Sequence, residues 1–263
     1  MVSSILIFAR QVQTSFAALA MVILICAGQP ALARMNDPFE SFNRMSHTGN
    51  LLLDRYIAKP ASEFYGKAVP SEVASLIQRM SSNLSLPRAA MNQFLQFQFE
   101  RGVHNSLRFF VNSTVGLAGA FDVAAYVGFY EYRTDFGATL YNSFGLGSGP
   151  YIELPAFGPS NLRDGIGLAV DMVFNPLYWV VPSLDVAGVI SFNAIAAVGK
   201  RHANATIVDT LFYESEDSYA QTKLYYTQNR EFELLGGFPE EDYMDPYIGT
   251  GDIYEELFGP FGN

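Results

Sequence analysis

The sequence has few of the residues from which metal, redox and catalytic sites are usually built. Among 263 residues there is one cysteine, Cys26, and there are three histidines, His47, His104 and His202. A lone cysteine excludes a disulfide framework and a cysteine-based metal or redox site. The histidines are far apart and have no H-x-x-x-H or H-E-x-x-H spacing. We therefore expect no metal and no other cofactor.

Charge is also scarce, and it is unevenly distributed. Charged residues make up 16% of the chain, against roughly 25% in ordinary domains. Residues 34–208 hold 13 basic and 13 acidic side chains. Residues 209–263 hold 13 acidic side chains and two basic ones, Lys223 and Arg230. A neutral body with an acidic end has no excess of positive charge with which to bind phosphate backbones, so a nucleic-acid partner is not expected.

The common catalytic motifs are missing as well. Ser148 lies in a glycine run but is flanked by Leu146 and Pro150, so it forms no G-x-S-x-G elbow. No P-loop and no complete dinucleotide-binding pattern occur. We predict no catalytic residue. Asp122 and Asp171, which lie in apolar surroundings where a raised pKa is conceivable, leave an envelope hydrolase as a third-ranked hypothesis.

Long apolar runs are absent, but a short one lies near the start of the chain. Residues 1–33 carry a single charge, and an apolar run of 11 residues, 16–26, is followed by Ala31-Leu32-Ala33. This pattern is typical of a signal peptide with cleavage after Ala33. Cys26 could instead be lipid-modified, although Ile25 before it is not the small residue that lipoprotein processing requires. Export without disulfides indicates a bacterial envelope protein.

What the chain does contain is apolar and aromatic: 49% hydrophobic residues, 22 Phe and 15 Tyr. Periodicity of 3.6 predicts helices with three candidate N-caps. Asp37 precedes Pro38 and an apolar row of Phe39, Phe42 and Met45. Ser71 begins a helix that is expected to end near Ser82. Ser218 is the candidate cap within the helical pattern of residues 191–230. A further helix from Pro87, interrupted near Gly102, carries the i+4 row Met91, Leu95, Phe99, Val103, Leu107 and Val111.

Three runs of small and apolar residues follow, at 115–130, 165–182 and 186–198, the second broken at Asn175-Pro176. Each is shorter than the roughly 18–20 unbroken apolar residues that a spanning helix needs. We expect buried helices, or helices lying partly in lipid.

Glycine and proline are concentrated in residues 135–164, where they forbid a continuous helix. Apolar residues lie among them, so we expect a structured apolar loop, a hairpin. Beyond Gly236-Gly237 the sequence turns acidic. The predicted organisation is a signal peptide at 1–33, one domain at 34–237 and a flexible acidic tail at 238–263.

Several segments together resemble the MlaA/VacJ family of phospholipid-transport proteins of the Gram-negative outer membrane. They are NDPFESFNR (36–44), NLLLD (50–54), KPASEFY (59–65), NLSLPRAAMNQFLQ (83–96), RFFVNSTVGLAGAFDVAAYVG (108–128) and residues 135–164. The resemblance implies an all-α fold: a ring-like bundle of amphipathic helices embedded in one leaflet, with an apolar Gly/Pro-rich hairpin loop. It also implies a location on the periplasmic side of the outer membrane.

The function implied is a passive phospholipid conduit. Mislocalised phospholipids leave the outer leaflet through a polar channel and pass to a periplasmic lipid-carrier protein, which maintains lipid asymmetry. Family members associate with trimeric outer-membrane porins. The alternative, from another class, is a structural adaptor that docks porin and carrier without binding lipid.

A channel for phospholipid needs a polar path for the headgroup. The candidates for it are polar residues within the apolar segments: Asp122, Asp171, Asn175 and Asn193. Their alternative role is helix capping or helix packing. In the family a hairpin close to the pore controls access, and the matching positions are 144–154. We expect its apolar contacts at Phe144, Leu146, Tyr151, Ile152 and Leu154, and its flexible joints at Gly145, Gly147 and Gly149.

Overall fold

The computed structural model describes residues 37–180 and 186–235. The predicted signal peptide at 1–33, with Cys26, and the acidic tail at 238–263 lie outside the described residues. Contacts divide the chain into two units, residues 1–223 and 224–263. The elements are α2 (Glu40–Leu53), π-helical η2 (Asp54–Ala58), α3 (Lys59–Ala68), α4 (Ser71–Leu95), α5 (Phe99–Thr114), α6 (Val123–Tyr126), α7 (Phe136–Phe144), β1 (Tyr151–Leu154), β2 (Gly158–Asn161), α8 (Leu162–Val173), α9 (Leu177–Val180), α10 (Val186–Ala203), α11 (Ala205–Asp209), π-helical η3 (Thr210–Glu214) and α12 (Ser218–Leu234).

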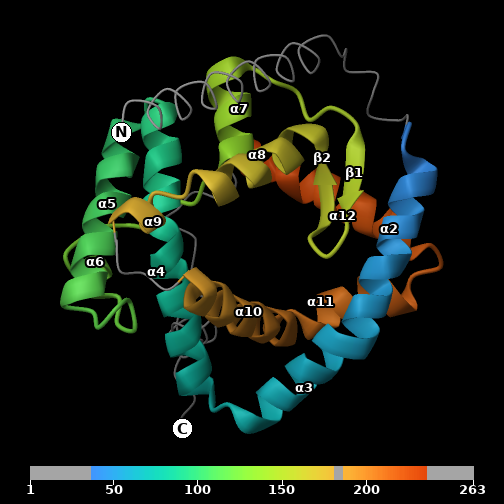
Figure 1. The fold of residues 1–263 in the computed structure, drawn as a ribbon, viewed down its shortest axis with the longest axis horizontal. Coiled ribbons are helices and arrows are strands. Elements are labelled where there is room, and N and C mark those ends of the chain that lie inside the picture. Colours follow the sequence, from blue (N-terminus) through green and yellow to red (C-terminus); the bar gives the residue numbers. More distant parts are fainter. Residues whose placement is uncertain (1–36, 181–185, 236–263) are drawn as a thin grey trace, which may run out of the picture. The chain divides into compact units, whose positions relative to one another are not determined.

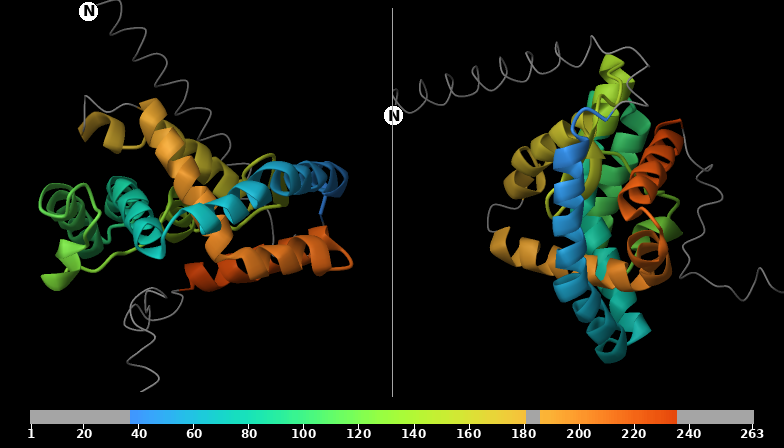
Figure 2. Two further views of the ribbon diagram at one scale, coloured as in Figure 1. Left: turned by 90° about the horizontal axis from the view of Figure 1, so that it is seen from below. Right: turned by 90° about the vertical axis from the view of Figure 1, so that its right-hand side faces the viewer.

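Within the first unit, contacts between elements form a closed circuit. It runs from α2 through η2, α3, α10, α4, α7, α8 and β1 back to α2 (Figure 1). The helix α5 packs along the outer side of this circuit against α4, and the two lie side by side in the further views of Figure 2. The circuit agrees with the predicted ring-like helical bundle.

The predicted hairpin exists, but it is shorter than the Gly/Pro-rich passage. Strands β1 and β2 pair antiparallel, with Tyr151 opposite Asn161 and Leu154 opposite Gly158. The first part of the passage is the helix α7 instead, which Asp135 caps by accepting from the Ala138 N–H at 2.7 Å. Gly145 ends α7 in the left-handed conformation, with φ of 66°.

The predicted helix break before Pro87 is wrong. The helix α4 runs through Pro87 without interruption, since packing of α5 along its length outweighs the local cost of the proline. The break predicted near Gly102 falls earlier, at Phe97, where φ is 59°. Gly102 lies inside α5, and a Cβ there would come within 2.7 Å of the Phe94 ring. Glycine at this position therefore gives room for Phe94 of α4.

Three further expectations are corrected. Residues 115–130 form turns and the four-residue α6 instead of a long helix; Leu117 and Ala118 adopt positive φ there. Asp37 does not cap α2, because its carboxylate accepts from more distant side chains. Asp217, rather than Ser218, accepts from the Ala220 N–H at the start of α12. The break at Asn175-Pro176 and a helix over 186–198 are confirmed.

The apolar core is small. Buried Leu140 and Leu146 form its centre, and residues of α7 and α8 pack around them, namely Phe136, Leu162 and Ile166. The helices α7 and α8 approach so closely that a Cβ on Gly167 would meet the Gly137 nitrogen at 2.3 Å. Glycine is required at this crossing because any side chain would separate the two helices.

The described part of the second unit, residues 224–235, continues α12. Its Arg230 pairs with Glu233 at 3.2 Å. Across both units, no helix in the described ranges combines the length and the apolar character needed to cross a membrane.

Candidate functional site

The helix α2 has its polar face buried and its apolar face exposed. Asn43, Ser46, His47 and Asn50 are buried, whereas Phe42 and Met45 are 46% and 66% exposed. In a water-soluble protein the apolar stripe of a helix faces the core. The amphipathic pattern predicted from Phe39, Phe42 and Met45 is present, but it is oriented outward.

The helix α5 shows the same inversion. Asn105, Arg108 and Asn112 are buried, and the exposed positions include Val103, Leu107 and Phe110. Over the described residues, 19 polar or charged residues are buried against 12 hydrophobic ones. On α2 and α5 the protein therefore presents apolar side chains to its surroundings and buries polar ones.

The buried polar face of α2 holds the hairpin. The Asn43 side chain donates to the Tyr151 carbonyl and accepts from the Glu153 N–H, at 3.0 and 2.9 Å. Glu153 is fully buried, and its carboxylate interacts with His47 at 3.3 Å and accepts from Asn50 at 3.1 Å and from the Tyr151 hydroxyl. These contacts fix β1 against α2.

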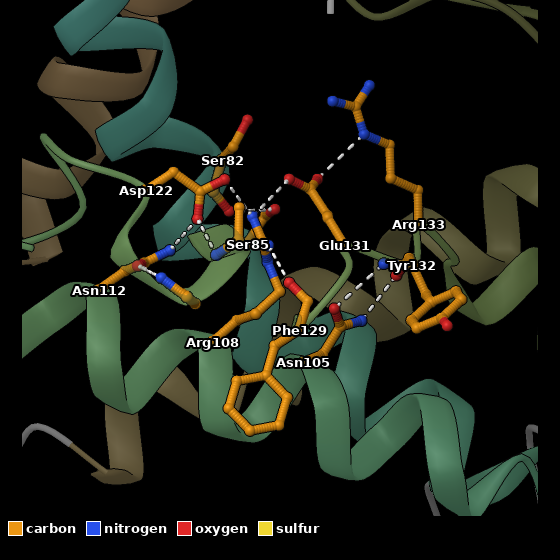
Figure 3. A network of polar contacts seen from close by, with 12 residues as sticks. Ser82, Ser85, Asn105, Arg108, Asn112, Asp122, Phe129, Glu131, Tyr132 and Arg133 are labelled. Carbon is orange, nitrogen blue, oxygen red and sulfur yellow. Dashed lines mark hydrogen bonds and ion pairs between the residues drawn. The ribbon is translucent and has the colours of Figure 1, made fainter. Parts of the chain in front are cut away.

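Asp122 lies in a second polar network, shown in Figure 3. Its carboxylate accepts from Arg108 at 2.7 Å and Asn112 at 2.9 Å, and it caps α6 by accepting from the Ala125 N–H. The Arg108 guanidinium also donates to the Phe129 carbonyl. Asp122 thus caps α6 and joins it to α5, which is the capping and packing role predicted as the alternative to lining a channel.

The segment 129–134 has no regular secondary structure, yet side chains of α4 and α5 hold it in place. The Tyr132 carbonyl accepts from Asn105 at 2.6 Å, and the Tyr132 N–H donates back to Asn105 (Figure 3). The same carbonyl accepts from Gln93 at 3.0 Å. Glu131 and Arg133, on either side of Tyr132, pair with each other at 3.0 Å. The network therefore fixes the backbone from which these two opposite charges extend.

Asp171 is buried where α8 meets α4 and α7. It accepts from Asn92 at 2.9 Å and from the Phe136 N–H at 3.0 Å. Burial raises the pKa of this carboxyl above its usual range, although both hydrogen bonds and the nearby Arg88 lower it. Its contacts join three helices.

This raised pKa gives a pH-dependent contribution to stability. The native carboxyl takes up its proton at a higher pH than the unfolded one, so stability gains as pH falls toward the ordinary value of 3.8. We expect Asp171→Asn to lack this gain. The free energy of unfolding of each protein is measured in detergent at about pH 7 and at about pH 4. The difference between the two proteins in the change over this pH range isolates the effect. Equal pH dependence in both would contradict it.

The other two channel candidates lie elsewhere. Asn175 accepts from the Leu177 N–H at 3.0 Å at the start of α9. Asn193 lies exposed on α10 and accepts from the Ser81 hydroxyl of α4 at 2.9 Å. The four candidates have different hydrogen-bond partners, and among the described residues no hydrogen bond joins any two of them.

The hairpin candidates divide into anchored and exposed residues. Leu146 and Tyr151 are buried, Ile152 and Leu154 are half-buried, and Phe144 is exposed. Gly145 and Gly149 have positive φ, whereas Gly147 has open space around it.

Several residues of these networks were not predicted from the sequence. Glu153 was overlooked, and His47 was treated as a single residue without a partner. The spacing of Asn43, His47 and Asn50 at i, i+4 and i+7 marks a polar helix face and could have indicated them. Within the described part of the chain, no group of His, Cys, Asp and Glu is arranged to hold a metal ion.

A helical protein that buries polar networks and exposes apolar helix faces belongs to the class whose outer surface is adapted to lipid. The family model for the MlaA lipoprotein matches residues 35–233. The chain is therefore a member of the MlaA lipoprotein family.

Individual relatives agree with this assignment. The chain is 32% identical over 206 residues to the intermembrane phospholipid transport system lipoprotein MlaA of Escherichia coli, covering 77% of this chain and 80% of that protein. It is 30% identical to an uncharacterized protein of Rickettsia typhi, covering 74% and 76%. A solved structure described as "Structural basis for maintenance of bacterial outer membrane lipid asymmetry" matches with a TM-score of 0.61 and 30% identity, covering 76% of this chain and 99% of that chain.

Proposed function

We propose that this protein is a passive phospholipid conduit of the Gram-negative outer membrane. It removes mislocalised phospholipids from the outer leaflet and passes them to a periplasmic lipid-carrier protein, and so maintains lipid asymmetry. A trimeric porin is the proposed neighbour in the membrane. No covalent bond is made or broken in this function.

The observation that carries the proposal is the inverted distribution of polar and apolar residues on α2 and α5. Large apolar side chains gain about 25 cal/mol for each Å² that leaves water, so exposed Phe42, Met45, Val103 and Phe110 favour contact with lipid chains. A polar interior is what a zwitterionic or anionic headgroup requires if it is to move without crossing hydrocarbon. The names of the relatives support the same conclusion.

Lipid content and lipid retrieval test this proposal. Full-length protein extracted in detergent should carry phospholipid in defined amount, and deletion of the gene should leave phospholipid in the outer leaflet and increase sensitivity to detergent and bile. A protein that carries no lipid but still co-purifies with porin and carrier would establish the structural adaptor instead. A deletion strain with unchanged lipid asymmetry would count against the conduit.

The hairpin gives a separate prediction about access to the conduit. A Cβ at Gly147 would meet no atom within 4 Å, and Gly147→Pro fixes φ and so stiffens the connection between α7 and β1. We expect lipid retrieval to change severalfold while the thermal unfolding transition and membrane fraction stay as in the parent.

Gly147→Ala is the matched control, because it adds the Cβ without locking the backbone. It should behave as the parent. Unchanged retrieval in Gly147→Pro would assign the loop to packing alone.

A further inference from the structure

One buried imidazole links the hairpin to α12. His47 is buried on α2, which lies beside β1 (Figure 1). Its Nδ1 atom lies 3.3 Å from the Glu153 carboxylate of β1. Its Nε2 atom lies 3.0 Å from the hydroxyl of Ser218, the first residue of α12. Three elements that are far apart in the sequence therefore meet at one side chain.

The hydrogen bonds around Glu153 define which atom of this link donates. The Asn50 amide and the Tyr151 hydroxyl both donate to the Glu153 carboxylate. A carboxylate that receives several donors acts only as an acceptor, so Nδ1 of His47 donates to it. With its proton on Nδ1, the imidazole accepts from the Ser218 hydroxyl at Nε2. One ring therefore connects a donor on α12 with an acceptor on β1.

Aromatic rings hold the imidazole and also contact the strand. Phe212 of η3 and Tyr219 of α12 pack edge-on against His47, with ring centroids 5.7 and 5.8 Å away. Tyr219 also packs edge-on against Tyr151 of β1, with centroids 5.9 Å apart. Lys223 lies 5.4 Å from the centroid of the Tyr151 ring. The first turns of α12 therefore contact β1 directly and through His47.

The contacts between β1 and its neighbours are of a kind that can open and close. The hydrophobic cluster around Leu140 and Leu146 is built from α7 and α8 and includes no residue of β1. The strand is held instead by side-chain hydrogen bonds such as those from Asn43 and Asn50. Each such bond shifts an equilibrium in water by only about two- to tenfold. Small changes in these contacts can therefore move β1.

The order Ser218, His47, Glu153 is also that of a catalytic triad, so the two roles must be compared. Acyl transfer needs free N–H donors for the oxyanion that forms. At the start of α12 the Ala220 N–H donates to the Asp217 carboxylate at 3.1 Å. A negative charge already occupies this helix terminus, so the geometry favours a positional role for the three residues over nucleophilic chemistry.

We infer that His47 is a positioning residue for the hairpin, and that the start of α12 sets the position of β1 through it. This inference rests on the proposed function, in which the hairpin governs access to the conduit, and it names the residues that hold the hairpin in place. A displacement of the first turn of α12 then moves β1 and changes the access of lipid.

The test measures the position of the hairpin relative to α12. Nitroxides replace Phe157 and Gln221, which are exposed on the hairpin turn and on α12, in the full-length chain carrying Cys26→Ser in phospholipid bilayers. Pulsed electron double resonance gives the distribution of distances between the labels. We expect Ser218→Ala to raise the population of displaced hairpins about two- to tenfold, and His47→Ala to raise it at least about tenfold. Lipid retrieval in cells should change severalfold in the same variants.

Two serine variants separate a lost link from a lost fold. Ser218→Thr keeps the hydroxyl and should restore the distances and the retrieval of the parent. Ser215→Ala is the matched control, because this half-buried hydroxyl bonds the Leu211 carbonyl of η3 at 2.6 Å, and it should leave both measurements unchanged. Thermal unfolding of every variant is measured alongside. Ser218→Ala removes only one half-buried hydroxyl, so it decides the test even if His47→Ala does not fold.

The outcomes that overturn the inference differ from those that overturn the proposed function. Distances like those of the parent in Ser218→Ala would overturn the positioning role and leave the conduit standing. A displaced hairpin with unchanged lipid retrieval would show that its position does not govern access. Covalent labelling of Ser218 by a fluorophosphonate would assign the three residues to nucleophilic chemistry instead. Unchanged lipid asymmetry after deletion of the gene would overturn the conduit, whatever the distances show.

Discussion

Replacing Met45 and Phe110 by aspartate should release the protein from membranes. Both side chains are 66% exposed, on α2 and α5 respectively. If these faces contact lipid, each new carboxylate must enter or approach hydrocarbon, at a cost of about 2.5–3.5 kcal/mol for a charge near the bilayer centre. We expect each substitution to weaken partitioning into vesicles by up to about 100-fold. Flotation of the purified full-length protein with phospholipid vesicles measures this loss.

The matched control is Gln221→Asp, which adds the same charge at an exposed polar position of α12. It should float as the parent protein does. Since neither Met45 nor Phe110 is buried, the variants should keep their helical content by circular dichroism. Flotation of the Met45→Asp, Phe110→Asp double variant at the level of the parent would show that these faces do not contact lipid.

The second large effect concerns the buried ion pair between η2 and α10. Arg201 donates to both oxygens of Asp54 at 2.9 Å, and both side chains are only 8% exposed. Tyr213 also donates to Asp54 at 2.7 Å, and Asp209 accepts from Arg201 at 2.6 Å. Removing one partner of a buried pair leaves an uncompensated charge, so Arg201→Ala should lower the free energy of unfolding by about 3–5 kcal/mol.

A surface pair provides the comparison. Arg44 bonds Asp217 at 2.9 Å, but both side chains are 44% exposed, and such pairs contribute about 0–1 kcal/mol. Denaturant unfolding of Arg44→Ala and Arg201→Ala in the same detergent should therefore give clearly different losses. Similar small losses would mean that the Asp54 and Arg201 pair does not hold η2 to α10.

Much of the helical fold follows from periodicity and breakers, whereas the direction in which each helix faces does not. The row Phe99, Val103, Leu107 correctly indicated one face of a helix. Periodicity alone does not say whether that face meets protein or lipid, because both are apolar environments. The polar spacing of Asn43, His47 and Asn50 carries the missing information, since such residues on one helix face need partners if that face is buried.

Other differences arise from tertiary contacts that local rules do not contain. Pro87 would end an isolated helix, but packing against α5 keeps α4 continuous. The run 115–130 is apolar enough for a helix, yet Asn83 packs so closely on Gly119 that a Cβ there would come within 2.4 Å, and φ of Gly119 is 90°. Except for the Ala125 N–H, the hydrogen-bond partners of Asp122 and Asp171 lie on other elements, so the sequence indicates both residues without showing what they bind.

Lipid contact at the exposed apolar faces can be measured directly with spin labels. Single cysteines at positions 45, 110 and 221, in a full-length chain carrying Cys26→Ser, would bear nitroxides in protein reconstituted into phospholipid bilayers. The labels replacing Met45 and Phe110 should relax with oxygen, which concentrates in hydrocarbon, and should be shielded from a water-soluble nickel chelate. The label replacing Gln221 should show the opposite preference. Strong relaxation by the nickel chelate at all three positions would contradict the account, because the apolar faces of α2 and α5 would then lie in water.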